Sequence, residues 1–333
     1  MSRATSFSGS ERETTAHPAP AVAARDAATR TPDSDRLAAG AGPGAAQLAD
    51  WRAVDWQAHQ RWVQLSNGPV SVIELGSGPP IVFVHGLAGS WPNWLEQMPV
   101  LCAEHRVIAL DLPGFGASPM PSQPISIELY ARTVLELMDA LEIDATALVG
   151  NSMGGEISCE LTLMAPERVE RLVLVSPAGI STAGVKGRLP LLRLIHPVAN
   201  LVSGLVSRQA DRIASRPRLR AATMKAVAAQ PLRIAPEFAA EQLRGAGKPG
   251  FMPALEAIVE HSGGLYERLP QIHCPTLVLW GDEDPLIPVR DADLFASQIE
   301  GSRKVVWRET GHVSMFERGA DFNALLSEFL DEG

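Results

Sequence analysis

The sequence predicts an α/β domain in which helices cover both faces of a mainly parallel central sheet. Short, continuous apolar runs recur along the chain, and segments with helical spacing separate them. A strand that is buried on both faces has this appearance, because neither face needs polar residues. The alternation of strands and helices is typical of parallel sheets. A chain of 333 residues, 46% apolar and 20% charged, is also long and apolar enough to bury a core.

Eight strands and three core helices are expected in chain order. Residues 61–65 and 70–75 alternate in polarity and predict an antiparallel pair joined through Asn67-Gly68. The parallel strands are predicted by six apolar runs, at 80–84, 107–110, 147–150, 171–175, 276–280 and 304–307. Helices are predicted by spacing at 127–141, 154–164 and 321–330.

The chain divides into a tail, a core domain and an inserted cap. Residues 1–48 contain almost no large apolar side chains and predict a disordered tail without the apolar core of a signal peptide. The core is expected to comprise 49–180 and 263–333. Residues 181–262 contain helical patterns and no clear strand, and predict a helical cap after the fourth parallel strand. Its apolar stretch 189–206 predicts a helix that packs on the core.

Composition argues against several classes of function. The formal net charge of −9 gives no support for nucleic-acid binding. No apolar run reaches the ~18 residues that a membrane span needs, so no stable membrane insertion is expected. Cys102, Cys159 and Cys274 are widely spaced and odd in number, which favours a reducing, cytoplasmic location and no disulfide framework. We expect no metal or cofactor, and a small hydrophobic molecule as the substrate.

A candidate nucleophile lies where the third parallel strand meets the next helix. Residues 150–154 read Gly-Asn-Ser-Met-Gly and fit the pattern G-x-S-x-G, with a buried strand before it and a helical run after it. The tight turn holds Ser152 in strained backbone angles and exposes its hydroxyl at the edge of the sheet. The start of the following helix stabilises negative charge there. The pattern therefore predicts Ser152 as a nucleophile.

A serine hydroxyl needs a general base and an acid that orients the base. Among eight histidines, His312 follows Ser152 and lies in a loop directly after the sixth parallel strand. The acid is expected after the fifth parallel strand, where Asp282, Glu283 and Asp284 follow one another. Asp284 is our prediction, and the sequence spacing leaves Asp282 open as the alternative.

Two backbone N–H groups are expected to hold the oxyanion of the reaction intermediate. One belongs to Met153, the residue after the nucleophile. The other belongs to Leu87, in the loop that follows the first parallel strand. His85 begins this loop, and we interpret it as a structural residue that fixes the loop by hydrogen bonds.

These motifs together resemble, in order, the signatures of the α/β-hydrolase superfamily. The resemblance covers about residues 62–330, with 181–262 poorly matched. It implies the triad Ser152, Asp284 and His312, the oxyanion hole of Leu87 and Met153, and a substrate pocket between core and cap. The matching segments are His-Gly at 85–86, Asp-Leu-Pro-Gly-Phe-Gly-Ala-Ser at 111–118, Gly-Asn-Ser-Met-Gly-Gly at 150–155, Gly-Asp-Glu-Asp at 281–284 and Gly-His at 311–312.

The resemblance leaves the reaction open between several hydrolase chemistries. The segment 150–155 is similar to the elbow of carbon–carbon hydrolases that act on meta-cleavage products, and it also occurs in ordinary esterases. Those carbon–carbon hydrolases usually carry Gly-Pro-Gly in the loop where this chain has Leu-Ala-Gly-Ser at 87–90, and Trp where it has Val313. Our prediction is therefore hydrolysis of hydrophobic acyl or aryl esters through an acyl-enzyme, with carbon–carbon hydrolysis as the alternative. A cofactor-free perhydrolase or haloperoxidase-like enzyme, or a non-catalytic binding protein, are further alternatives.

Overall fold

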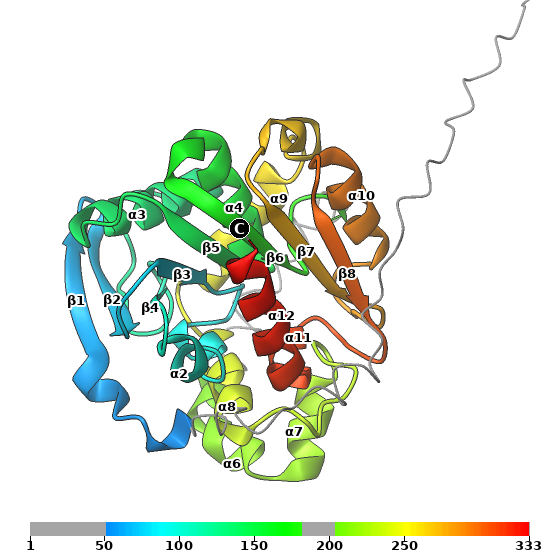
Figure 1. Ribbon diagram of the computed structural model, residues 1–333. Coiled ribbons are helices and arrows are strands. Elements are labelled where there is room, and N and C mark those ends of the chain that lie inside the picture. Colours follow the sequence, from blue (N-terminus) through cyan, green and yellow to red (C-terminus); the bar gives the residue numbers. More distant parts are fainter. Residues whose placement is uncertain (1–50, 182–203, 333) are drawn as a thin grey trace, which may run out of the picture. The chain divides into compact units, whose positions relative to one another are not determined.

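The computed structural model describes residues 51–181 and 204–332, all within one compact unit of the chain (Figure 1). The predicted tail at 1–48 lies outside the described residues, as does most of the apolar stretch 189–206. None of the described helices is long and apolar enough to cross a membrane.

Eight strands form one sheet in the order β1-β2-β4-β3-β5-β6-β7-β8. Antiparallel pairing joins β1 to β2 and β2 to β4, and every other neighbouring pair is parallel. The predicted fold class is confirmed, because each predicted strand overlaps an observed one. The strands are β1 (Gln60–Leu65), β2 (Gly68–Leu75), β3 (Pro80–Val84), β4 (Arg106–Leu110), β5 (Thr146–Asn151), β6 (Val169–Val175), β7 (Thr276–Gly281) and β8 (Arg303–Trp307).

Helices lie between most of the parallel strands. The α-helices are α2 (Met98–Leu101), α3 (Ile127–Ala140), α4 (Met153–Met164), α6 (Ala210–Ala214), α7 (Pro217–Met224), α8 (Pro236–Gly245), α9 (Phe251–His261), α10 (Arg290–Gln298), α11 (Ser314–Glu317) and α12 (Gly319–Asp331). The 3-10 helices are η1 (Trp51–Ala53), η2 (Trp56–His59), η3 (Trp91–Trp94), η4 (Pro166–Arg168) and η6 (Tyr266–Gln271).

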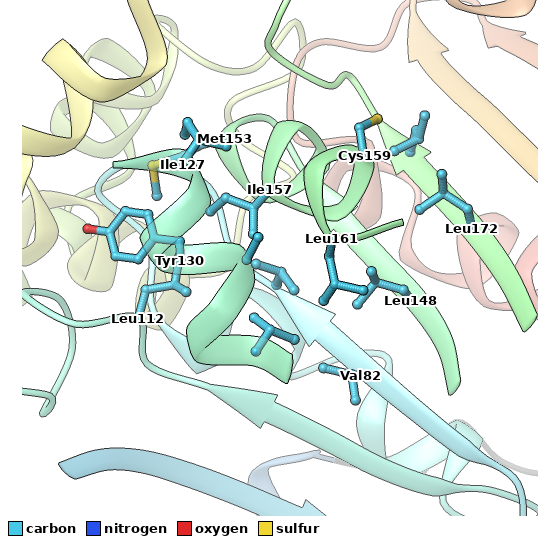
Figure 2. Packing of buried hydrophobic residues seen from close by; sticks show 14 of the residues in the cluster. Val82, Leu112, Ile127, Tyr130, Leu148, Met153, Ile157, Cys159, Leu161 and Leu172 are labelled. Carbon is cyan, nitrogen blue, oxygen red and sulfur yellow. The ribbon is translucent and has the colours of Figure 1, made fainter. Parts of the chain in front are cut away.

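The sheet separates two apolar layers, because successive side chains of a strand point to opposite faces. In β3, Val82 and Val84 face a layer that includes α3, α4 and α10. Ile81 and Phe83 face the other layer, which includes α2, α8 and α12. Figure 2 shows the first layer, where side chains of α3 and α4 pack against strand residues such as Val82. Burial on both faces explains the continuous apolar runs of the parallel strands.

The described part of the chain between β6 and β7 is helical. We call residues 204–262 the β6–β7 segment; it contains α6, α7, α8 and α9 and no strand. It lies where the helical cap was predicted. Its α8 approaches the loop after β3 so closely that a Cβ on Gly245 would lie 1.8 Å from the carbonyl oxygen of Ala88. The segment therefore packs directly on the loop in which the oxyanion donor was predicted.

The parallel strands bring their carboxyl ends to one edge of the sheet, which is where α/β proteins place their sites. Each predicted site residue follows such an end. Leu87 follows β3, Ser152 follows β5, Asp284 follows β7 and His312 follows β8.

Candidate active site

The turn at Ser152 has the geometry that its sequence pattern requires. Ser152 has φ 56° and ψ −119°, in a region that residues with a side chain rarely adopt. A Cβ on Gly154 would lie 2.1 Å from the carbonyl oxygen of Val84, and one on Gly150 would lie 2.3 Å from that of Gly154. Both positions therefore need glycine, because Gly154 lies against the end of β3 and Gly150 lies against the start of α4.

The base and the acid are hydrogen-bonded to each other. His312 Nδ1 and Asp284 Oδ2 are 2.7 Å apart, and both side chains are buried. The other oxygen of Asp284 accepts hydrogen bonds from the backbone N–H groups of Leu286 and Ile287, at 2.8 and 3.0 Å. Asp282 is exposed. The structure thus brings Asp284 to His312, and it leaves the Nε2 nitrogen of His312 as the ring atom that remains for a proton from serine.

Asn151 joins the nucleophile turn to the His312 loop. Its Nδ2 group donates to the carbonyl oxygen of His312 at 3.3 Å and to that of Val175 at 3.0 Å. Asn151 is 2% exposed and directly precedes Ser152. The backbone of His312 is therefore held beside the turn. The sequence shows Asn151 only as a residue of the G-x-S-x-G pattern. It does not reveal the contact with His312, because the two residues are 161 positions apart.

The loop after β3 passes directly beside the nucleophile. A Cβ on Gly86 would lie 3.1 Å from the Cβ of Ser152. Leu87 follows in this loop, and Met153 is the first residue of α4, so both residues predicted as oxyanion donors are neighbours of this contact. The N–H groups in the first turn of a helix have no acceptor within the helix. Such groups suit the stabilisation of an oxyanion.

His85 is fully buried and holds the same loop by two hydrogen bonds. Its Nδ1 donates to the carbonyl oxygen of Gly86 at 2.8 Å, and its Nε2 accepts from the N–H of Leu112 at 3.0 Å. Burial lowers the pKa of His85 to about 4, although the bond to Gly86 opposes the shift. The ring is therefore neutral at pH 7, and both nitrogens are occupied, as the structural interpretation expects.

Asp111 supports the loop from the other side. Its carboxylate accepts hydrogen bonds from the N–H groups of Trp91 and Ala117, both at 2.8 Å. Burial raises the pKa of Asp111 to about 6, although these bonds oppose the shift. A Cβ on Gly116 would collide with the carboxylate of Asp111. The segment 111–118 thus folds around one buried carboxylate that fixes the start of η3.

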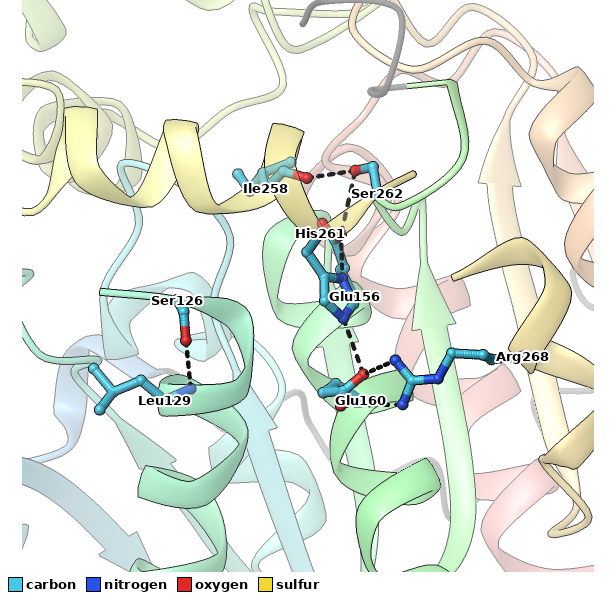
Figure 3. Close-up of polar contacts among 8 residues, drawn as sticks. All are labelled: Ser126, Leu129, Glu156, Glu160, Ile258, His261, Ser262 and Arg268. Atoms are coloured by element: carbon cyan, nitrogen blue, oxygen red, sulfur yellow. Dashed lines mark hydrogen bonds and ion pairs between the residues drawn. The ribbon is translucent and has the colours of Figure 1, made fainter. Parts of the chain in front are cut away.

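A buried ionic cluster connects the β6–β7 segment to the nucleophile helix (Figure 3). His261, at the end of α9, contacts Glu156 of α4 through Nδ1 at 2.8 Å and Glu160 through Nε2 at 2.9 Å. Arg268 also binds Glu160, at 2.7 Å. Burial opposes a charge on His261, but the two carboxylates outweigh it and raise its pKa to about 9. Since α4 begins beside Ser152, this cluster ties the segment to the site.

The described residues can supply a nucleophile, a base, an orienting acid and oxyanion donors. Within 51–181 and 204–332, no group of three or more His, Cys, Asp and Glu side chains is arranged to hold a metal ion. The sequence assigns no individual substrate-binding residue within the predicted cap at 181–262, and part of this range lies outside the described residues.

Comparison with known proteins gives a family for the chain. The model of the family described as alpha/beta hydrolase fold matches residues 79–319, which is more than half of the chain. The 2-hydroxymuconate semialdehyde hydrolase of Pseudomonas sp. (strain CF600) is 32% identical over 269 residues, covering 77% of this chain and 88% of the relative.

Two further comparisons find proteins whose names describe other activities. The dihydrolipoyllysine-residue acetyltransferase component of the acetoin cleaving system of Cupriavidus necator is 32% identical over 77% of this chain. The alignment with it spans 64% of that relative's length, and with its counterpart from Pseudomonas putida 65%. The solved structure of Est816, an N-acyl homoserine lactone degrading enzyme, has a TM-score of 0.66 and 27% identity, covering 81% of this chain and all of that chain.

Proposed function

Because the chain belongs to the α/β-hydrolase family, we propose that it is a serine hydrolase with Ser152 as nucleophile, His312 as base and Asp284 as the acid that orients His312. The observation that carries the proposal is the 2.7 Å hydrogen bond between His312 and Asp284, in a site where Ser152 has strained backbone angles. In this proposal the β6–β7 segment serves as the predicted cap over the site.

The reaction follows from these positions. His312 takes the proton of the Ser152 hydroxyl while the Ser152 oxygen attacks the carbonyl carbon of the substrate. The N–H groups of Leu87 and Met153 hold the resulting oxyanion. When the bond to the leaving group breaks, His312 returns the proton to that group. Water then attacks the acyl-enzyme with the same base, which releases the acid and restores Ser152.

Among the candidate reactions, we place hydrolysis of a carbon–carbon bond in a meta-cleavage product first. This choice is supported by the 2-hydroxymuconate semialdehyde hydrolase, since 32% identity extends over 88% of that relative and thus over core and inserted segment alike. The nucleophile turn at 150–155 is also similar to that of carbon–carbon hydrolases that act on meta-cleavage products. In this reaction the leaving group is a carbon atom whose electron pair is delocalised into the unsaturated chain, and it receives the proton from His312.

Ester hydrolysis is the second candidate, and two sequence features favour it. The chain has Leu-Ala-Gly-Ser at 87–90 and Val313 where the carbon–carbon hydrolases usually carry Gly-Pro-Gly and Trp. Val313, the residue after His312 in the chain, is buried. The likeness to Est816, an N-acyl homoserine lactone degrading enzyme at 27% identity, also agrees with this candidate, because a lactone is a cyclic ester.

A direct competition between substrate classes tests the choice. The purified chain is assayed with a dienoic ring-fission product, followed by loss of its absorbance, and with p-nitrophenyl esters of increasing acyl length. The Ser152→Ala variant measures the uncatalysed background. We expect kcat/KM for the ring-fission product to exceed that for the best ester at least about 10-fold, which corresponds to ~1.4 kcal/mol of transition-state binding. The reverse order would make the chain an esterase.

A further inference from the structure

Glu317, at the end of α11, bridges two segments that meet beside His312. Its Oε1 accepts a hydrogen bond from the N–H of Gly311 at 2.8 Å, and its Oε2 accepts one from the N–H of Gln230 at 2.7 Å. Gly311 belongs to the His312 loop, and Gln230 belongs to the β6–β7 segment. Glu317 is 4% exposed, so these N–H groups receive acceptors that water would otherwise supply.

Two more hydrogen bonds join the same segments. The N–H of His312 donates to the carbonyl oxygen of Val227 at 2.9 Å. The side chain of Gln230 donates through Nε2 to the carbonyl oxygen of Glu309, also at 2.9 Å. Residues 227–230 therefore run alongside 309–312, with His312 itself among the bonded residues.

The contact is also tightly packed. A Cβ on Gly311 would lie 2.5 Å from the nitrogen of Ala229 and 2.8 Å from Oε1 of Glu317. No side chain fits there without a shift of backbone, so the two segments have little freedom to slide past each other. Any displacement of 227–230 would move the backbone of the base.

We propose that Glu317 is a positioning residue that locks residues 227–230 of the β6–β7 segment to the His312 loop, so that correct seating of this segment sets the position of the base. The proposal rests on the proposed function, because it assigns Glu317 a role only through His312. It adds a link between the segment expected to select the substrate and the residue expected to move the proton.

A carboxylate suits this role better than any uncharged side chain. Each of its two oxygens accepts from a different segment, whereas an amide has one accepting oxygen and would turn its NH₂ group toward the other N–H. Burial raises the pKa of Glu317, and the charge of Asp284 adds to this, while the backbone N–H groups oppose it. If the Glu317 side chain only filled space, an uncharged residue would serve there without the repulsion from Asp284.

The test compares Glu317→Gln with Glu300→Gln, an exposed acid outside the site. Each variant is labelled with diisopropyl fluorophosphate, a small probe that reports the reactivity of Ser152, and is assayed for kcat and KM on the better substrate. Circular dichroism at the assay temperature confirms that each variant is folded. We expect Glu317→Gln to slow labelling and lower kcat about 10- to 100-fold, with a smaller change in KM, because small misplacements of a base have effects of this size. Glu300→Gln should match the wild type.

A second variant, Gln230→Ala, is measured alone if Glu317→Gln does not fold, and its wild-type labelling rate would then overturn the proposal; the double variant and the comparison of both variants apply where Glu317→Gln folds. Gln230→Ala removes the bond to Glu309 and should slow labelling about 3- to 10-fold. In the double variant the two effects should be less than multiplicative, since both act on one contact. Wild-type labelling rates in both folded variants, or a change confined to KM, would overturn the proposal. A wild-type chain that does not label at all would instead refute the proposed function.

Discussion

Replacing His261 with alanine is expected to lower the free energy of unfolding by about 3 kcal/mol. The side chain of His261 is 6% exposed, and it lies between the carboxylates of Glu156 and Glu160, which are 0% and 5% exposed. Removing one partner of a buried ionic contact typically costs ~3–5 kcal/mol, because the remaining charge is left without compensation.

The lower end of that range follows from what each carboxylate retains. Glu160 keeps two contacts with Arg268, at 2.7 and 3.1 Å. Glu156 keeps the hydroxyl of Ser262 at 3.2 Å. Burial already raises the pKa of Glu156, so it would take up a proton instead of staying charged, which limits the loss. Most of the expected cost therefore comes from Glu156.

Urea unfolding of the variants at pH 7 measures this cost from the midpoints at constant slope. His59→Ala, at an exposed histidine, is the matched control and should stay within about 0.5 kcal/mol of the wild type. Adding Glu156→Gln to His261→Ala should recover part of the loss, because the stranded carboxyl is gone. A loss below about 1 kcal/mol for His261→Ala, or no recovery in the double variant, would refute the reasoning.

Three further predictions concern pH, the acid and the nucleophile turn. The pKa of His261 is raised from 6.5 to about 9, so its contribution to stability is complete below pH 6.5 and is lost as the pH rises through about 9; urea midpoints should fall over this interval in the wild type and less in His261→Ala. Asp284→Asn should lower kcat by about 10⁴-fold, as loss of an orienting acid does, whereas Asp282→Asn should change it less than about 3-fold; steady-state kinetics of both variants decide this, and equal losses would contradict the assignment. Gly154→Ala should abolish labelling of Ser152 and destabilise the fold, because its Cβ would collide with β3, whereas Gly263→Ala, which has open space, should leave labelling and thermal midpoint near wild type.

Much of the fold could be predicted because local patterns encode it. The parallel strands β3 to β7 are largely buried on both faces, and such burial produces continuous apolar runs in the sequence. The turn at Ser152 could be predicted because close contacts, of Gly150 with α4 and of Gly154 with β3, demand glycine at both positions. The loop histidine could be predicted because it follows the end of β8.

The remaining features depend on contacts that no local pattern carries. Asp282 and Asp284 both follow β7, and the hydrogen bonds that Asp284 Oδ1 accepts from the N–H groups of Leu286 and Ile287 direct its other oxygen to His312. Glu317 meets Gln230 across 87 positions, and His261 meets Glu156 across 105. Pairings this distant in sequence appear only once the β6–β7 segment is packed on the core.

We propose Ser152 as a nucleophile that His312 and Asp284 activate. Labelling of the folded wild-type chain with diisopropyl fluorophosphate, followed by peptide mass mapping, tests this role of Ser152. We predict one adduct per chain, located on Ser152, absent from Ser152→Ala and formed far more slowly in Asp284→Asn. The absence of an adduct, or an adduct on another residue that persists in Ser152→Ala, would contradict the account.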